Sequence, residues 1–107
     1  MTHTSNTLLS KSTLAELASK LGVTVEDILS HCRRAELVDA RSMIVAVLLK
    51  RPHTRQQDIA PLLGISQAAV SKLLARHQLF MIQYAYYVRR FSQFEQEVKD
   101  DDTGLAY

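Results

Sequence analysis

The chain has 107 residues, of which 47% are hydrophobic and 22% charged, and a single Cys. This length fits one domain, and the composition is that of a globular protein rather than a disordered one. One Cys excludes an internal disulfide and a zinc site built on several thiolates. The longest apolar run, residues 43–49, is too short for a membrane helix, and no secretory signal is visible. We therefore expect a cytoplasmic protein with no membrane segment.

The net charge of +2 conceals an uneven distribution along the chain. Residues 1–30 carry −1, and residues 31–90 carry ten basic against three acidic side chains, or +7. Residues 91–107 carry −4. This separation indicates an anionic partner for the basic middle of the chain.

Capping signals predict where the first helices begin. Residues 1–12 are polar and without periodicity, and we expect them to be disordered. Capping boxes, in which a Thr hydroxyl and a side chain three residues later satisfy free backbone N–H groups, predict helix starts at Thr13, Thr24 and Thr54. The first helix is expected over 13–21, before Gly22, and the second over 24–34.

The rest of the chain is also predicted to be helical. A third helix, apolar nearly all round, is predicted over 39–51 as the buried centre of a bundle, ending at Pro52. No alternating pattern predicts a strand. Residues 66–99 contain neither Gly nor Pro, and one helix of that length would be ~50 Å long, so we expect a break between His77 and Leu79. The predicted fold is all-α, a compact bundle of five to six helices with a long C-terminal helix.

Residues 54–79 have the layout of a helix-turn-helix. Two helices that cross steeply need a small residue at the crossing, here Ala60, and a turn residue that tolerates positive φ, here Gly64. Ser66 is placed to cap the second helix. Pro61 leaves the start of the first helix open: it kinks a helix that begins at Thr54, but lies in the first turn if Asp58 is the cap. We interpret residues 13–79 as a DNA-binding domain.

The second helix of this motif, from Gln67, is the predicted recognition helix. Its outward face is small and polar at its start and basic at its end, which suits base edges in the major groove and then phosphates. The start of the preceding helix lies where side chains meet the phosphate backbone. The motif thus predicts DNA contacts by Arg55, Gln56, Ser66, Gln67, Ala68, Ser71, Lys72 and Arg76.

An upstream segment repeats the motif at a constant offset of 42 residues, with Ala18 and Gly22 in the places of Ala60 and Gly64. It is either a second DNA-reading unit or a helix-turn-helix used only for packing. Glu26 and Asp27 favour packing, because phosphates would repel them.

From about Leu14 to His77, the order of elements resembles the C-terminal DNA-binding domain of the bacterial replication initiator DnaA, a helix-turn-helix fold of the Trp-repressor type. The matching segments are residues 25–30, 33–34, 40–44 leading into Leu48, and 58–59. The resemblance implies that Arg33, Arg34 and Arg41 contact the DNA backbone or minor groove. The family's Asp-His-Thr-Thr-Val signature is Ser-Gln-Ala-Ala-Val here, and its ATPase domain is absent. We therefore expect a stand-alone relative with a different sequence preference.

Aromatic residues dominate residues 80–99 at helical spacing, followed by an acidic tail at 100–107. This helix either packs on its own bundle or forms a homodimer; the seam consists of Phe80, Tyr84, Tyr87, Phe91 and Phe94. No catalytic set or metal-ligand spacing is visible, so we expect no enzyme activity, metal or cofactor. The leading hypothesis is sequence-specific binding of double-stranded DNA by a regulator of transcription or replication. The rival is a protein-interaction module that uses the C-terminal helix, with the helix-turn-helix as scaffold.

Overall fold

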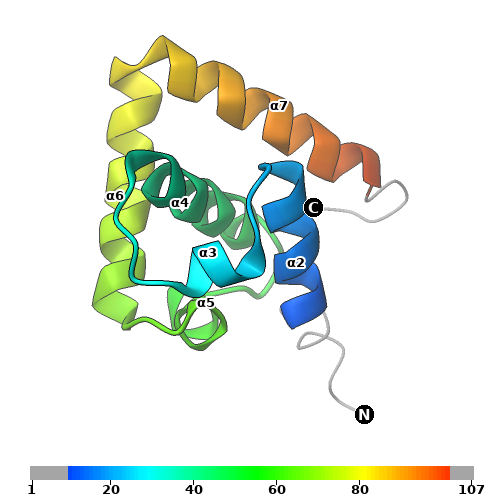
Figure 1. Ribbon diagram of the computed structural model, residues 1–107, viewed down its shortest axis with the longest axis vertical. Helices are drawn as coiled ribbons and strands as arrows, with labels where there is room; N and C mark the ends of the chain where they lie inside the picture. The colour runs from blue at the N-terminus through cyan, green and yellow to red at the C-terminus, as the bar shows by residue number, and fades with distance from the viewer. Residues whose placement is uncertain (1–9, 102–107) are drawn as a thin grey trace.

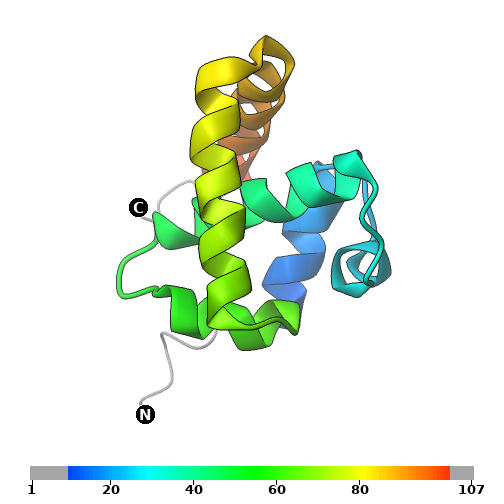
Figure 2. The ribbon, with the colours of Figure 1, turned by 90° about the vertical axis from the view of Figure 1, so that its left-hand side faces the viewer.

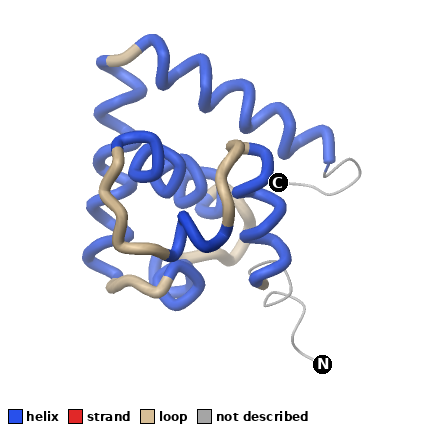
Figure 3. The backbone as a smooth tube through the Cα atoms, viewed as in Figure 1, coloured by secondary structure: helices blue, strands red, loops and turns tan. Residues whose placement is uncertain are grey.

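The computed structural model describes residues 10–101, which form a bundle of helices (Figure 1). No described residue lies in a strand (Figure 3), so the all-α prediction is confirmed. None of the described helices has the length and apolar character needed to cross a membrane. The helices are α2 (Lys11–Lys20), α3 (Val25–Leu29), α4 (Ala35–Leu49), α5 (Gln56–Leu63), α6 (Gln67–Gln83) and α7 (Ala85–Asp101).

Helix α4 is the buried centre of the bundle, as its apolar sequence predicts. Met43, Ile44 and Leu48 are fully buried, and the other helices are arranged around them (Figure 1). The helix begins at Ala35, so the predicted start at Asp39 is wrong. Asp39 is a buried residue within the helix, where side chains of other helices satisfy its carboxylate.

Helices α2 and α3 cover the upstream segment in which the sequence pattern of the motif repeats. Ser10, not Thr13, caps α2, because its Oγ accepts a hydrogen bond from the Thr13 N–H at 3.2 Å. Residues 11 and 12 are therefore helical rather than disordered, and residues 1–9 lie outside the described part of the chain. The Thr24 cap of α3 is confirmed, with its Oγ1 3.0 Å from the Asp27 N. Helix α3 ends at Leu29, well before the predicted end at residue 34. Ser30 is its C-cap, and an extended loop begins there.

Helices α5 and α6, with the turn at Gly64 between them, cover the segment interpreted as a helix-turn-helix. Helix α5 begins at Gln56, so the start at Thr54 is wrong: Arg55 is the N-cap, and its N–H donates to the Asp58 carboxylate at 2.9 Å. Pro61 lies in the helix interior, on its exposed side. Gly64 adopts the left-handed conformation with φ 69°, as the motif predicts.

The two turns share one geometry. The Ile65 N–H donates to the Ala60 carbonyl at 3.0 Å, and the Val23 N–H donates to the Ala18 carbonyl at 3.0 Å. The two motifs differ in the length of the second helix, which is 17 residues in α6 and 5 in α3.

Helix α6 runs unbroken through residues 77–79 and ends at an elbow at Tyr84, so the predicted break is wrong. His77 is buried within α6, where its Nδ1 lies 2.9 Å from the Tyr87 hydroxyl. From the elbow, α7 turns back over the bundle and packs along α2, α4 and α6 (Figure 1).

The aromatic side of α7 completes the core of the same bundle. Tyr87, Phe91 and Phe94 are buried within the chain, in one hydrophobic cluster with residues of α2, α4, α5 and α6. The packing alternative thus accounts for these three rings. The expected boundary at 79/80 falls inside α6, and Asp100 belongs to α7 rather than to an acidic tail. Residues 102–107 lie outside the described part of the chain.

Candidate nucleic-acid interface

The outer face of the first half of α6 is exposed and carries no carboxylate. Figure 2 shows α6 in front of the bundle, with the α3–α4 loop on one side and the α4–α5 loop on the other. Ser66 fixes where the helix begins, because its Oγ accepts the Ala69 N–H at 3.1 Å. Of the residues predicted to face outward from α6, Arg76 is only half-exposed and is described below. The others are exposed: Gln67, Ala68, Ser71, Lys72 and Ala75.

Two predicted contact residues of α5 lie beside this face. The Ser71 hydroxyl donates a hydrogen bond to Oε1 of Gln56, which joins the start of α5 to α6. The amide nitrogen of Gln56 keeps its donor capacity toward a base edge or a phosphate. Arg55 is exposed at the N-cap of α5, and its guanidinium has no partner among residues 10–101.

The α3–α4 loop presents Arg33 and Arg34, which the resemblance assigned to DNA. Both are exposed, and Arg34 forms a solvent-facing ion pair with Glu36 at 3.7 Å. An exposed pair of this kind contributes little to stability and leaves Arg34 able to exchange its partner. Arg33 has no hydrogen bond or ion pair to any described residue.

Arg41 holds this loop in place and does not face outward as an unengaged cation. Its Nε donates to the Ile28 carbonyl at 2.9 Å, and its Nη1 donates to the Cys32 carbonyl at 2.8 Å. Its Nη2 donates to the carbonyls of Asp27 at 3.0 Å and Ser30 at 2.9 Å. Burial lowers the pKa of this guanidinium, which still remains protonated at neutral pH. Arg41 therefore positions the loop that carries Arg33 and Arg34.

Arg76 is the exception on the outer face of α6, because it folds back onto the bundle. Its Nη2 lies 2.6 Å from Oδ1 of Asp39, whose side chain is 3% exposed. The other carboxylate oxygen accepts the Tyr86 hydroxyl at 2.8 Å, and the guanidinium stacks over Phe80 at 4.0 Å from the ring centroid. This network joins α4, α6 and α7 around one buried charge. We infer that the main role of Arg76 is to stabilise the fold.

Sequence reasoning missed Asp39 and Tyr86 as the partners of Arg76. The only sign of this network in the sequence is Asp39, an acidic residue at the edge of an otherwise apolar segment. Its position instead predicts the start of a helix. A buried carboxylate needs a cation or donors to offset its desolvation, so an acid in such a helix predicts a partner, though not which one.

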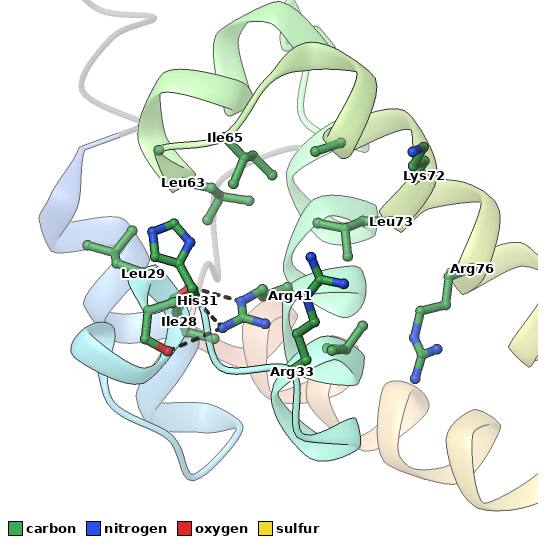
Figure 4. Close-up of a pocket in the computed structure, with 14 residues that line it drawn as sticks. Ile28, Leu29, His31, Arg33, Arg41, Leu63, Ile65, Lys72, Leu73 and Arg76 are labelled. Atoms are coloured by element: carbon green, nitrogen blue, oxygen red, sulfur yellow. Dashed lines mark hydrogen bonds between the residues drawn. The ribbon is translucent and has the colours of Figure 1, made fainter.

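The structure brings four of the predicted arginines and lysines to one groove. Arg33 and Arg41 line it on the loop side, and Lys72 and Arg76 line it on the α6 side (Figure 4). His31 joins them on the loop side, a position that no pattern in the sequence indicates. Arg55, Gln56 and Ser71 form a second group at the start of α5, and Arg34 lies outside the groove.

The upstream motif offers no comparable face. Leu17, Ala18 and Ile28 are buried in the core, and the first turn of α3 carries Glu26 and Asp27. Both features support the packing role for this segment.

Residues 10–101 contain no group of three His, Cys, Asp or Glu side chains arranged to hold a metal ion. No family model, curated protein or solved structure matches the chain.

Proposed function

We propose that this protein binds double-stranded DNA, with the first half of α6 in the major groove, and that it acts as a sequence-specific regulator of transcription or replication. The observation that carries the proposal is the exposed, carboxylate-free face of α6 between two loops that carry basic residues (Figure 2). The helix-turn-helix geometry and the resemblance to the initiator's DNA-binding domain support it.

The contacts divide into two classes. Gln67 and Ala68, at the start of α6, suit base edges, because an amide pairs with adenine and a methyl group contacts thymine. Lys72, Arg33 and Arg55 suit phosphates, since they are exposed cations without partners among the described residues.

Arg41 and Arg76 have a different role in this proposal. They hold the α3–α4 loop and α6 in position, and their charges add to the field of the surface without direct contact.

The affinity should depend steeply on salt. With Arg33, Arg34, Arg55 and Lys72 on phosphates, the slope of log K against log salt is about −3.6. Raising the salt from about 50 to about 200 mM then weakens binding about 100-fold.

The test is a titration of a labelled duplex of mixed sequence, followed by fluorescence anisotropy at these two salt concentrations. Lys72→Glu should abolish binding at the higher salt. Lys99→Glu is the matched control, because it makes the same change of charge at the exposed far end of α7. No binding by the unmodified protein at low salt, or equal loss in both variants, contradicts the proposal.

A second candidate function is association through the elbow between α6 and α7. Leu79, Ile82, Tyr84 and Tyr86 are exposed there, and Ile82 is 83% exposed. Tyr87, Phe91 and Phe94 lie in the core and cannot contact another protein. The exposed elbow is therefore the surface that we assign to a homodimer or a protein partner.

Sedimentation of the protein and of Ile82→Asp tests this second candidate, independently of DNA binding. A dimer that the substitution dissociates supports association at the elbow, and a monomer at high concentration rules out the homodimer.

A further inference from the structure

A groove of about 560 Å³ lies between the α3–α4 loop and α6. The end of α3 and the loop form one wall, and α6 forms the other (Figure 4). The first half of α4 and the α5–α6 turn lie between these walls. The volume lies within the range typical of sites for small organic ligands.

The interior of the groove is apolar. Ile28 and Leu63 are buried at its base, and Val38, Ile65 and Leu73 are half-buried around them. A DNA backbone needs cations and N–H donors, not an apolar hollow. The proposed DNA interface therefore explains the rim of the groove but not its interior.

The rim of the groove is basic, and of the described cations that line it Arg76 forms an ion pair, with Asp39. His31, Arg33 and Lys72 line it without a hydrogen bond or ion pair to any residue in the described range. Arg41 adds a positive charge that is bound only to backbone carbonyls and the Ser30 hydroxyl. Among residues 10–101, no Asp or Glu lines the groove. A ligand complementary to this site has an apolar body and an anionic head.

We propose that the groove binds a small organic carboxylate with an apolar body, such as an aryl or short alkyl group. The body lies against Leu63, Ile65 and Leu73, and the carboxylate faces Arg33 and Lys72. A guanidinium fork matches a carboxylate in geometry, and an apolar body gains from leaving water.

Occupancy of the groove should also oppose DNA binding, a consequence that rests on the function proposed above. The carboxylate neutralises two of the cations assigned to phosphates. By linkage, DNA then lowers the affinity for the carboxylate by the same factor.

The proposal is tested without DNA by titrating the full-length protein with phenylbutyrate while recording amide NMR spectra. The expected result is saturable shifts confined to residues that line the groove, with a Kd of about 1 mM or below. Phenylbutyramide has the same body without the charge and should bind about tenfold more weakly. Acetate has the charge without the body and should produce no saturable shifts at these concentrations.

Substitutions on the rim locate the carboxylate of the bound ligand. Arg33→Gln and Lys72→Gln should each weaken phenylbutyrate binding about fivefold, and Lys72→Arg should retain it. Arg55→Gln is the matched control, because it removes an exposed charge outside the groove. It should leave phenylbutyrate binding unchanged while it weakens DNA binding.

Three outcomes overturn the proposal: no saturable shifts in the groove, equal binding of the amide, or shifts centred on the elbow instead. Each of these is independent of DNA. Failure of DNA binding with intact phenylbutyrate binding removes the proposed function and leaves the ligand site in place.

Discussion

Replacing Arg41 with Lys separates a structural role from a DNA-contacting role, because the positive charge is retained and the guanidinium fork is lost. The four backbone carbonyls that Arg41 contacts lie between Asp27 and Cys32, at 2.8 to 3.0 Å. An ammonium group carries its three N–H donors on one atom, so at the position of Nη2 it can keep two of these four bonds at most. Two lost bonds at about 1 kcal/mol each predict that the free energy of unfolding falls by about 2 kcal/mol.

The assay is equilibrium unfolding in urea, followed by circular dichroism, with Arg33→Lys as the control. Arg33 is exposed and has no partner among the described residues, so its substitution should change the free energy of unfolding by less than about 0.5 kcal/mol. An Arg41→Lys variant as stable as the control would refute this reasoning. It would return Arg41 to the role implied by the resemblance, as a contact to DNA.

Three further predictions concern the fold. Gly64→Ala should lower the free energy of unfolding by about 1 to 2 kcal/mol in urea unfolding, because φ is 69° there although no atom lies within 4 Å of an added Cβ. Gly64→Asn should cost less, and equal costs would refute a conformational origin. Burial and the charge of Lys50 lower the pKa of His77, so its protonation opposes folding and stability should fall as the pH decreases below about 6.5. His77→Gln should lose that part of the dependence in urea unfolding at several pH values, and an identical pH profile would contradict it. Phe94→Ala should cost about 3 to 5 kcal/mol, since the ring is 2% exposed in the common core, and a cost under about 1 kcal/mol would mean that α7 docks only loosely.

Helices α5 and α6 and the turn between them could be predicted from sequence because local chemistry specifies them. Gly64 and Ser66 act within a few residues of their own positions, through a positive φ and a cap, and the structure shows both. Buried and exposed faces of α6 followed from periodicity for the same reason. The all-apolar pattern of α4 likewise predicted its central place.

The features that the sequence did not reveal depend on contacts between distant residues. The elbow at Tyr84 has no Gly or Pro to mark it, and it forms where α7 can bury Tyr87 and Phe91 against the bundle. The cap of α2 is the exception, because it is local: Ser10 and Thr13 both offer a hydroxyl near the helix start, and propensity does not decide between them.

The same limit explains the arginines. Arg41 and Arg76 look like surface cations in the sequence, but one binds carbonyls 9 to 14 residues away and the other binds a carboxylate 37 residues away. Charge and spacing could place them near the basic surface. Only the three-dimensional structure shows which of these cations already form hydrogen bonds or ion pairs within the chain.

The central claim, that the first half of α6 reads DNA, is tested most directly by mapping amide NMR shifts of the full-length protein on addition of a short duplex at low salt. The account predicts that the largest shifts fall on residues 66–76, the start of α5 and the α3–α4 loop. They should shrink as salt is raised, and they should be smaller in Lys72→Glu at the same duplex concentration. Shifts centred on the elbow or on α7, or no shifts at all, would contradict it.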